Sequence, residues 1–362
     1  MRKKVLILAN HFVTIYKFRK ELVCELVKEG YDVVISLPFS KDIDKIKDFG
    51  VRVIDTNVDR KSLNPIEDIK LFNNYKKVIK EEKPDIVIAY TIKCNIYGGM
   101  ASRVYNVPFF ANVTGLGSAY YKGGILKKIV STLYKLGLKK AKGVFFENKA
   151  NAQVMIDDKT IEEKQAIVMN GAGVNLDAFN YSQMPSDEIT KFLFVGRVME
   201  EKGVNELFTA IKKLKSEGCN AEFGFLGWFE EDYSEVITEL EDKDIIKYYG
   251  YQEDVARFMK DAHCIVLPSY HEGMANVLLE GAAMGRGLIA SDIHGCKESI
   301  IDGKSGFVCK VKDSEDLYEK LKEFASLTYE DKVEMGKVGR KHMEDVFDKN
   351  KVVRETVEVI GR

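Results

Sequence analysis

The sequence predicts an α/β protein made of two doubly wound domains, each a parallel sheet wrapped by helices. Three observations support this prediction. Short β-branched and aromatic runs alternate with amphipathic stretches along the chain, as in successive strand–helix–strand units. A turn-rich segment at residues 170–188 separates two such series. Finally, a chain of 362 residues is long for a single core.

The runs predicted to form buried parallel strands are short and apolar. They are residues 4–10, 31–37, 51–55, 84–90, 107–113 and 142–148, then 191–197, 221–227, 246–250, 263–269, 287–292 and 306–311. We expect a first domain of residues 1–170, a second of residues 171–345, and a helix at residues 346–362 that crosses back to the first. Doubly wound domains bind ligands at the carboxyl ends of their strands, so the predicted site is a cleft where two such edges face each other.

Composition and cysteine usage are those of a soluble globular protein. Hydrophobic residues make up 45% of the chain and charged ones 31%, which excludes a disordered or membrane-spanning class. The apolar run near the start is about five residues long, shorter than the ~7–15 of a signal peptide, and is expected to form the first strand. The six cysteines are scattered without a C-x-x-C motif, which argues against a zinc site or disulfide framework and fits a reducing cytoplasm.

The net charge of −1 conceals an asymmetry between the two halves of the chain. Residues 1–170 hold 30 Lys and Arg against 19 Asp and Glu, whereas residues 171–362 hold 25 against 37. A basic half joined to an acidic half indicates that the basic half meets an anionic partner. No nucleic-acid-binding motif accompanies the lysines, so nucleic acid is not the expected partner.

The stretch FVGRVMEEKGVNEL, residues 194–207, carries a candidate anion site. A strand is expected to end at Gly196, and Arg197 and Lys202 follow it just before a helix. Two cations beside a helix N-terminus suit a diphosphate and could stabilise a leaving group without a metal. A solvated surface pair would have the same local sequence, so this motif alone leaves both interpretations open.

The stretch LPSYHEGMANVLLEGAAMG, residues 267–285, places Glu272 and Glu280 among small and apolar residues. A helix that begins near Met274 would leave Glu272 in the loop before it and put Glu280 about two turns inside, with open backbone amides at residues 273–275. Carboxylates accept hydrogen bonds from vicinal hydroxyls, so Glu280 could bind a ribose and Glu272 a transferred sugar. The alternative is a helix cap at Glu272 and a salt bridge at Glu280.

These two stretches, followed by SDIHGCKESIIDGKSGFV, resemble the C-terminal domain of glycosyltransferase family 4 (GT4), whose retaining members have the two-domain GT-B fold and use nucleotide-sugar donors. The E-x7-E pair of that family falls on Glu272 and Glu280, and its diphosphate-binding Arg and Lys fall on Arg197 and Lys202. NGAGVNLDAF is similar to its interdomain G-x-G-V-(D/N) segment. The expected catalytic residues are therefore Glu272, Arg197 and Lys202. The expected donor-binding residues are Glu280, Gly273, Met274, Ala275, Asn276, Gly171, Gly173 and Gly196.

The first half resembles transferases of bacterial capsule, exopolysaccharide and protein-glycosylation pathways, which extend a sugar chain on a polyprenyl diphosphate. The similarity lies in TIKCNIYGGMASRVYNVPFFANVTGLGSAY, where Cys94 replaces a proline of that group. The glycine-rich loop and the late histidine of the broader family have no counterpart here. TGLGSAY could replace the loop, and His11, Tyr90 or Thr91 the histidine. The expected acceptor-side residues are His11, Thr91, Lys93, Asn95, Thr114, Gly115 and Gly117.

Residues 120–143 carry seven lysines, three tyrosines and no acid. Ile125, Ile129, Leu133 and Leu136 recur at helical spacing, apart from the lysines. Such a helix is predicted either to lie on an anionic membrane, where each Lys adds ~1 kcal/mol, or to pack on the core with a basic exposed face. The basic character of the whole first half favours the membrane.

The sequence thus predicts a retaining glycosyltransferase that needs neither a cofactor nor a metal, since the D-x-D strings at Asp42–Asp44 and Asp242–Asp244 are expected to be solvated. Its donor would be a UDP-sugar, by resemblance an N-acetylhexosamine or a uronic acid, held by the second domain. The first domain would bind a lipid-linked or oligosaccharide acceptor, peripherally at the cytoplasmic face of the cell membrane. A UDP-sugar 2-epimerase of the same fold and a non-catalytic glycan- or lipid-binding module are the alternatives.

Overall fold

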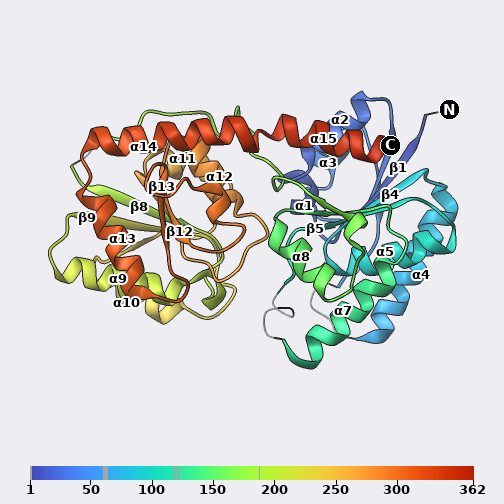
Figure 1. Ribbon diagram of the computed structural model, residues 1–362, viewed down its shortest axis with the longest axis horizontal. Helices are drawn as coiled ribbons and strands as arrows, with labels where there is room; N and C mark the ends of the chain where they lie inside the picture. Colours follow the sequence, from blue (N-terminus) through green and yellow to red (C-terminus); the bar gives the residue numbers. More distant parts are fainter. Residues whose placement is uncertain (1, 60–63, 118–119, 121–122, 187) are drawn as a thin grey trace. The chain divides into compact units, whose positions relative to one another are not determined.

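The computed structural model describes residues 2–59, 64–117, 120, 123–186 and 188–362. The chain forms two compact units (Figure 1). Unit 1 comprises residues 1–172 and 350–362, and unit 2 comprises residues 173–349. The boundary between them lies two residues beyond the expected one, and the C-terminal segment belongs to unit 1.

Unit 1 is built on a parallel sheet with the strand order β3-β2-β1-β4-β5-β6-β7. The order reverses between β1 and β4, which makes their carboxyl ends the switch point of the sheet. The short edge strand β7 is the one that the sequence did not predict, because it is only half-buried and has no long apolar run. The strands are β1 (Lys4–Leu8), β2 (Asp32–Leu37), β3 (Arg52–Asp55), β4 (Ile86–Tyr90), β5 (Phe109–Val113), β6 (Gly143–Phe146) and β7 (Ala166–Val168).

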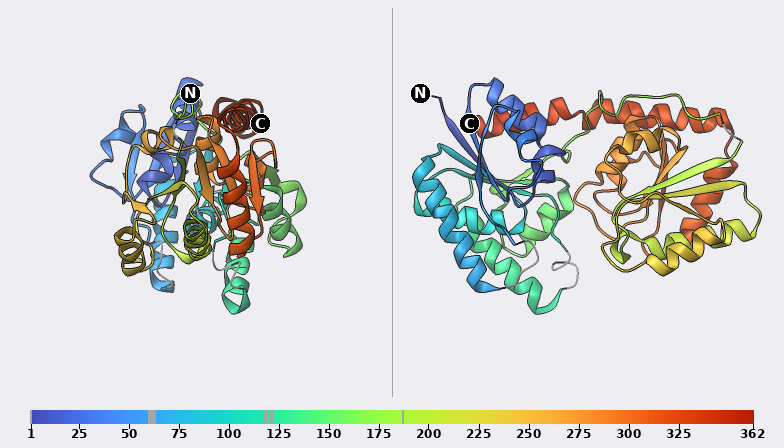
Figure 2. Two further views of the ribbon diagram at one scale, coloured as in Figure 1. Left: turned by 90° about the vertical axis from the view of Figure 1, so that its left-hand side faces the viewer. Right: turned by 180° about the vertical axis from the view of Figure 1, so that it is seen from behind.

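Successive strand residues face opposite sides of this sheet and form two separate cores. One core contains Leu6 and Val87 and is covered by α4, α5, α7 and α8, whereas the other contains Val5 and Ile88 and is covered by α1, α2 and α3 (Figures 1 and 2). Both sheet faces are therefore buried, as in other doubly wound sheets. The helices are α1 (Phe12–Tyr16), α2 (Lys20–Lys28), α3 (Asp44–Lys47), α4 (Pro65–Glu82), α5 (Ile92–Val104), α7 (Gly124–Leu138), α8 (Lys149–Asp157) and the 3₁₀ turn η1 (Glu163–Gln165).

The C-terminal helix α15 (Lys349–Gly361) completes the second of these cores. Its apolar residues recur at helical spacing, and Val352, Val353 and Ile360 are buried among the residues of β1, β2 and α2. Figure 2 shows α15 on the same face of the sheet as α2 and α3. The last helix of the chain is therefore part of the N-terminal fold.

Unit 2 holds a second parallel sheet, with the order β10-β9-β8-β11-β12-β13. Helix α9 packs beside α13 and helix α12 beside α14, and the order reverses between β8 and β11. All the strands predicted for this half are present: β8 (Thr190–Val195), β9 (Ala221–Leu226), β10 (Lys247–Tyr248), β11 (Cys264–Leu267), β12 (Gly287–Ser291) and β13 (Gly306–Cys309). The helical segments are η2 (Glu200–Lys202), α9 (Val204–Ser216), α10 (Ser234–Asp242), α11 (Val255–Lys260), α12 (Asn276–Ala283), η3 (Lys297–Ser299), α13 (Ser314–Ser326), α14 (Tyr329–His342) and the π-helical turn η4 (Met343–Phe347).

Candidate active site

In unit 2 the candidate site lies at the carboxyl ends of β8 and β11, where the strand order reverses. These strands are hydrogen-bonded neighbours. β8 leads into the loop that carries Arg197 and Lys202, and β11 leads into the loop that carries Ser269 and Glu272. Two motifs that lie about 70 residues apart in sequence thus meet at one sheet edge.

The two loops are held together by several short-range contacts. The Tyr270 backbone N–H donates to the Glu201 carbonyl at 2.9 Å, and Nε2 of His271 lies 3.2 Å from Oε2 of Glu201. Burial lowers the pKa of His271, and the neighbouring Glu201 carboxylate partly opposes this shift. Gly203 has a φ of 69°, and a Cβ there would lie 2.0 Å from the carbonyl oxygen of Pro268. Only glycine therefore permits this approach of the two backbones.

Lys202 and Glu272 form an ion pair at the centre of this edge. The ammonium of Lys202 contacts Oε1 of Glu272, and the hydroxyl of Ser269 donates to the same oxygen at 2.9 Å. The two charged side chains are 17% and 14% exposed, and Ser269 is fully buried. Water screens such a pair less than one on the open surface. The predicted phosphate-binding lysine and the predicted sugar-binding glutamate are thus partners of each other.

Arg197 is the more exposed of the two predicted cations. Its side chain is 42% exposed, and Nη1 lies 3.6 Å from Oε2 of Glu230, which follows β9. Gly196, just before it, donates its backbone N–H to Leu226 at 2.9 Å and so extends the pairing of β8 with β9. Each predicted cation therefore has a carboxylate of the protein beside it.

Glu280 lies on α12, nearer to the start of the helix than expected. The helix begins at Asn276 rather than at Met274, so Glu280 is its fifth residue and lies about one turn inside, not two. Asn276 and Glu280 share the half-buried face of the helix, whereas Leu278 and Leu279 are buried in the core. Asn276 and Glu280, which are both expected to bind the donor, thus lie on one face of the helix.

The backbone around the start of α12 corrects a second expectation. The Ala275 amide is not open to a ligand, because it donates to the carbonyl of Gly295 at 2.7 Å, and the Asn276 amide donates to Met274 at 3.0 Å. Gly273 and Met274 are buried beside it. Gly295 has a φ of 91°, and a Cβ there would lie 2.7 Å from the carbonyl oxygen of Gly273. The loop after β12 therefore packs directly on the Glu272 loop.

Gly171 and Gly173 belong to different units. Gly173 has a φ of 68°, and a Cβ there would lie 2.7 Å from Cα of Lys349, next to the bridge between Val174 and Asp348. It serves the fold of unit 2 by letting two backbone segments touch. Gly171, with a φ of 61°, lines a small cavity of unit 1. The donor-binding roles of both glycines stay predictions.

At the switch point of unit 1 the backbone, rather than charged side chains, is distinctive. Thr91 follows β4 with a φ of 77° and a ψ of 160°, a conformation that β-branched residues rarely adopt. His11 follows β1, and its Nδ1 accepts a backbone N–H at 3.1 Å, which caps α1. Thr114, Gly115 and Gly117 follow β5 and are half-buried, with φ values of 151° and 79° at the two glycines.

Two predicted acceptor-side residues face the interior of unit 1. Asn95 is fully buried on α5, and its Nδ2 donates to the carbonyl of Asn112 on β5 at 2.8 Å. The predicted contact of Asn95 with an acceptor is therefore wrong, because the side chain has no exposed surface and instead ties α5 to the sheet. The Lys93 ammonium lies 2.9 Å from Oδ1 of Asp68 on α4, and the side chains are 16% and 20% exposed. The acceptor role of Lys93 stays a prediction.

A buried ion pair beside these loops was not predicted. Nη2 of Arg19 donates to Oε1 of Glu147 at 3.0 Å, and the guanidinium lies over the ring of Tyr90, 5.0 Å from its centroid. These three residues, together with Gly171, line a cavity of about 30 Å³. A cavity of this volume has room for one water. The pair joins the start of α2 to the end of β6. The pair could not be predicted from the sequence, because single charges usually face solvent and these two lie 128 residues apart.

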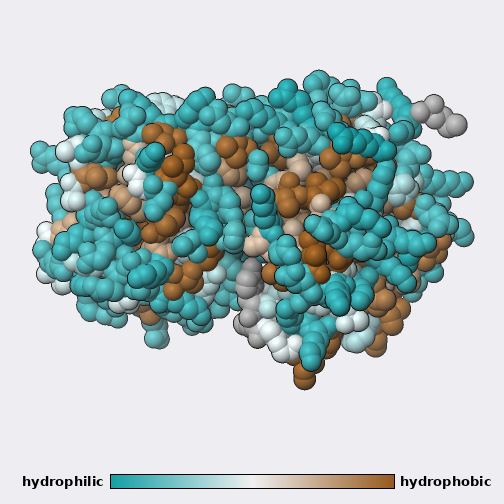
Figure 3. Space-filling view, in the orientation of Figure 1, coloured by the Kyte–Doolittle hydropathy of each residue, from teal (hydrophilic) through white to brown (hydrophobic). Residues whose placement is uncertain are grey.

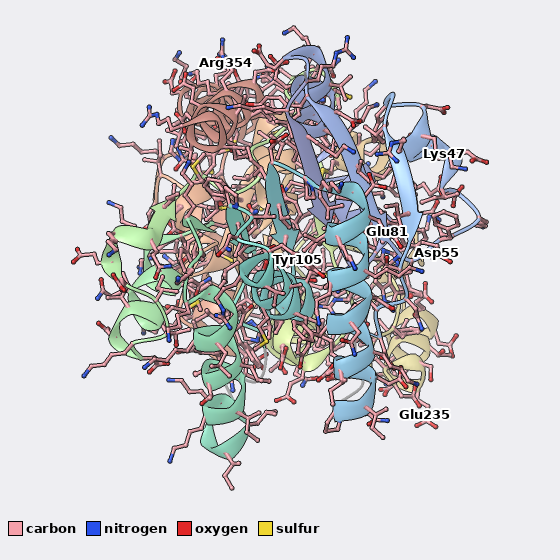
Figure 4. All side chains as sticks on the ribbon, turned by 90° about the vertical axis from the view of Figure 1, so that its right-hand side faces the viewer. Lys47, Asp55, Glu81, Tyr105, Glu235 and Arg354 are labelled. Atoms are coloured by element: carbon pink, nitrogen blue, oxygen red, sulfur yellow. The ribbon has the colours of Figure 1, made fainter. Side chains whose placement is uncertain are left out.

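A wider groove of about 600 Å³ lies at the other edge of unit 1. It is lined by Lys3, Glu29, Tyr31 and Arg354 and lies between α2 and α15, at the amino ends of β1 and β2. Figure 4 labels Arg354 at this end of the unit. Doubly wound sheets bind ligands at the opposite edge, so this groove lies outside the candidate site.

Comparison with known proteins identifies the class of protein that this fold and site define. Residues 182–342, in unit 2, match the family model described as "Glycosyl transferases group 1". Residues 4–148, in unit 1, match the model described as "Glycosyl transferase 4-like". The chain belongs to these families of glycosyltransferases, which confirms the resemblance drawn from its motifs.

The chain is also similar to individual glycosyltransferases. The N,N'-diacetylbacillosaminyl-diphospho-undecaprenol alpha-1,3-N-acetylgalactosaminyltransferase of Campylobacter jejuni is 28% identical over 98% of this chain and 97% of its own length. The UDP-Gal:alpha-D-GlcNAc-diphosphoundecaprenol alpha-1,3-galactosyltransferase of Escherichia coli is 23% identical over 80% and 78%. Among solved structures, Anabaena HepE in complex with UDP and glucose is 15% identical, with a TM-score of 0.81 over 99% of this chain and 100% of that one. This likeness confirms the GT-B fold, while the cleft between the domains stays a prediction.

Proposed function

We propose that the protein is a retaining glycosyltransferase that moves a sugar from a UDP-sugar to an oligosaccharide carried on polyprenyl diphosphate, in the biosynthesis of a surface polysaccharide or glycan. The observation that carries this proposal is the position of Arg197, Lys202 and Glu272 in two loops at the switch point of unit 2, where Lys202 pairs with Glu272. The names of the Campylobacter and Escherichia relatives, which both specify a diphospho-undecaprenol-linked sugar, support the acceptor class.

Unit 2 would hold the donor. Arg197 and Lys202 would bind the diphosphate, and the carboxylate of Glu280 would accept hydrogen bonds from the ribose hydroxyls. Glu272 would accept them from the transferred sugar. The UDP and glucose in the HepE complex are in keeping with a UDP-sugar donor. Of the two expected donor sugars, an N-acetylhexosamine is supported over a uronic acid by the name of the Campylobacter relative.

In the proposed reaction the acceptor hydroxyl attacks the anomeric carbon on the face from which the diphosphate departs. The bond between that carbon and the diphosphate oxygen breaks as the glycosidic bond forms, and the hydroxyl proton passes to the departing phosphate of UDP. Arg197 and Lys202 stabilise the negative charge on the leaving group, and Glu272 stabilises the positive charge on the sugar ring. These steps use protein cations where other enzymes use a metal.

Unit 1 would bind the acceptor at the edge formed by Thr91, Thr114, Gly115 and Gly117. Backbone amides in glycine-rich turns can approach an anion closely, which suits the diphosphate of a lipid-linked acceptor. The excess of Lys and Arg over Asp and Glu in residues 1–170 adds a long-range attraction for the same group.

Helix α7 supports contact of unit 1 with an anionic membrane at the cytoplasmic face. Ile125, Leu126 and Ile129 in its first half are 78%, 38% and 51% exposed, so they do not form the buried face of an ordinary core helix. Ile66 and Ile69 at the start of α4 are 62% and 60% exposed. Figures 1 and 4 show the N-terminal ends of α4 and α7 at the same end of unit 1, and Figure 3 shows hydrophobic surface there.

Lysines surround the exposed apolar residues of α7. Lys128, Lys135, Lys139 and Lys140 are exposed, and no acid lies between residues 120 and 143. Residues 121–122 of this predicted membrane segment lie outside the described residues. Within the part of the chain that the structure describes, no helix has both the length and the apolar character needed to cross a bilayer. The proposed contact is therefore peripheral, with apolar side chains entering the interface between lysines.

The proposal is tested first by thermal unfolding of the full chain with nucleotides and UDP-sugars, with and without EDTA. We expect UDP and one UDP-sugar to raise the unfolding temperature, each by the same amount with EDTA as without it. That sugar is then offered with a polyprenyl-diphosphate-linked glycan, and a product of retained anomeric configuration is expected. Conversion of the UDP-sugar without an acceptor would indicate a 2-epimerase. Stabilisation by a free glycan but by no nucleotide would indicate a binding module.

The membrane contact is tested by co-sedimentation with vesicles of neutral lipid alone or with about 30% anionic lipid. We expect binding to anionic vesicles only, and Ile125→Ser/Ile129→Ser to weaken it about tenfold, because two apolar side chains leave the interface. The matched control is Val104→Ser, which is 52% exposed at the end of α5. It lies next to Tyr105, which Figure 4 labels near the middle of the view, away from the N-terminal ends of α4 and α7. Equal losses in both variants would refute the contact.

A further inference from the structure

The carboxylate of Glu272 has two donors at one oxygen, and they differ in mobility. The Lys202 ammonium contacts Oε1 at the end of a four-carbon side chain, whereas the Ser269 hydroxyl donates to the same Oε1 at 2.9 Å from a fully buried residue. Lysine carries large rotamer freedom, and a buried serine very little. One donor can therefore turn away while the other stays.

The pairing of Lys202 with Glu272 conflicts with the roles that the two side chains have in the proposed reaction. An ammonium paired with a carboxylate presents almost no net charge to a diphosphate, and the carboxylate repels it. A carboxylate paired with an ammonium also has fewer lone pairs for sugar hydroxyls. Both side chains need new partners before they can act on a donor.

We propose that donor binding exchanges the partners of this pair, a step that rests on the proposed function. Lys202 turns from Glu272 to the diphosphate, and Glu272 accepts hydrogen bonds from the hydroxyls of the sugar. Ser269 is the positioning residue that keeps the carboxylate in place during this exchange. The loop contacts of Glu201 with Tyr270 and His271 keep the two backbones together while the side chains change partners.

The exchange has a consequence whose sign distinguishes it from a simple contact. Glu272 competes with the diphosphate for Lys202, so removing the carboxylate charge strengthens the binding of a ligand that carries phosphates but no sugar. Glu272→Gln keeps the size of the side chain and removes that competition. If Glu272 only contacted the donor sugar, the same substitution would leave the affinity for UDP unchanged.

The matched control is Glu201→Gln, which removes the same charge from the residue next to Lys202. The carboxylate of Glu201 contacts His271, whereas the ammonium of Lys202 pairs with Glu272, so this variant changes the local charge while the Lys202–Glu272 pair keeps both of its members. Lys202→Ala, alone and combined with Glu272→Gln, tests whether the gain in affinity for phosphate ligands depends on the ammonium of Lys202.

Titration calorimetry of the full chain with UDP and with inorganic pyrophosphate tests the exchange. We expect Glu272→Gln to bind both about three- to fivefold more tightly than wild type, the scale of a partly exposed ion pair. Glu201→Gln should gain less than about twofold, because only long-range charge changes, and the gain of Glu272→Gln should vanish when Lys202 is alanine. If wild type binds UDP and pyrophosphate but Glu272→Gln binds them no more tightly, the exchange is overturned and the donor site is not. The same holds if the gain in affinity persists when Lys202 is alanine. Wild type that binds neither UDP nor pyrophosphate would overturn the proposed donor site as well.

The positioning role of Ser269 is tested by steady-state kinetics. Ser269→Ala should lower kcat about tenfold with little change in the affinity for UDP, as expected when a group that orients a functional side chain is lost. Ser269→Thr keeps the hydroxyl and should recover most of the loss. A wild-type kcat in Ser269→Ala would refute the role. An equal loss in both variants, with unchanged thermal stability, would also refute it, because the hydroxyl would then not matter.

Discussion

At the carboxyl edge of unit 2, the residues predicted to bind the donor form ion pairs, whereas the residues predicted to bind the acceptor, at the corresponding edge of unit 1, have uncommon backbone conformations. Lys202 with Glu272 and Arg197 with Glu230 are held by loops that touch backbone to backbone. In unit 1, Thr91 has a positive φ, and Asn95 on the helix that follows it is fully buried. The same sheet topology thus carries two different kinds of edge.

This difference indicates which kind of ligand each edge is suited to bind. Paired charges in a partly buried place can exchange partners with a charged ligand of fixed geometry, such as a diphosphate. A strained backbone costs on the order of 1–3 kcal/mol and persists where the surrounding structure determines it, often at functional sites. We therefore expect substitutions in unit 2 to affect the chemistry and those in unit 1 to affect stability or acceptor binding.

The largest expected effect is on catalysis in unit 2. Glu272→Gln should lower kcat by about 10²–10³, because it removes the charge that stabilises the transition state, while the KM for the donor changes far less. Steady-state kinetics with the UDP-sugar and acceptor measure both. Glu280→Ala, on the helix that follows the Glu272 loop, is the comparison in the same unit, and it should mainly raise the donor KM. If kcat of Glu272→Gln equals that of wild type, Glu272 does not have the proposed role in the chemistry.

The next effect compares loop packing in the two units through two glycines of similar φ. Gly203→Ala should destabilise the protein by about 3 kcal/mol or more, because its Cβ would meet the Pro268 carbonyl oxygen and its φ is 69°. Gly117→Ala should cost only about 1 kcal/mol, because its φ of 79° is strained but its nearest neighbour is the flexible end of Ile92 at 3.2 Å. Urea unfolding followed by circular dichroism measures both. Equal losses would contradict the difference between the edges.

A third effect distinguishes a structural role of Asn95 from the predicted contact with the acceptor. Asn95→Ala should lower the free energy of unfolding by about 2 kcal/mol, because it deletes a buried side chain and leaves the Asn112 carbonyl without its donor. The KM for the acceptor should stay within about twofold of wild type, as expected for a residue that acts on the fold alone. Asn73→Ala, on the exposed surface of α4, is the control. A raised acceptor KM with unchanged stability would restore the original acceptor role.

The smallest expected effect is the pH dependence that comes from His271. Its pKa is lowered in the folded protein, chiefly by burial, so the unfolded chain binds a proton at higher pH than the folded one. Stability should therefore fall as the pH drops below about 6.5, the pKa of an unperturbed histidine, and become flat again below the folded pKa. His271→Asn should remove this part of the slope in urea unfolding measured between pH 5 and 8. An unchanged slope would show that His271 is not its source.

The sequence by itself determined the fold class, the strands of both sheets except β7, and the residues that gather at the edge of unit 2. These features follow from local patterns, since apolar periodicity marks strands and helices, and parallel strands bring their carboxyl ends to one edge. Arg197, Lys202 and Glu272 were predictable because each follows a strand in a recognisable motif.

Only the tertiary structure decided which of these groups touch. It pairs Lys202 with Glu272, closes the Ala275 amide onto Gly295, and buries Asn95 against the sheet. It also buries Arg286, whose guanidinium donates to the carbonyls of residues 182, 262 and 284. This burial lowers the pKa of Arg286 to about 10. Such pairings join residues far apart in the chain, and they depend on packing distances that no local pattern contains.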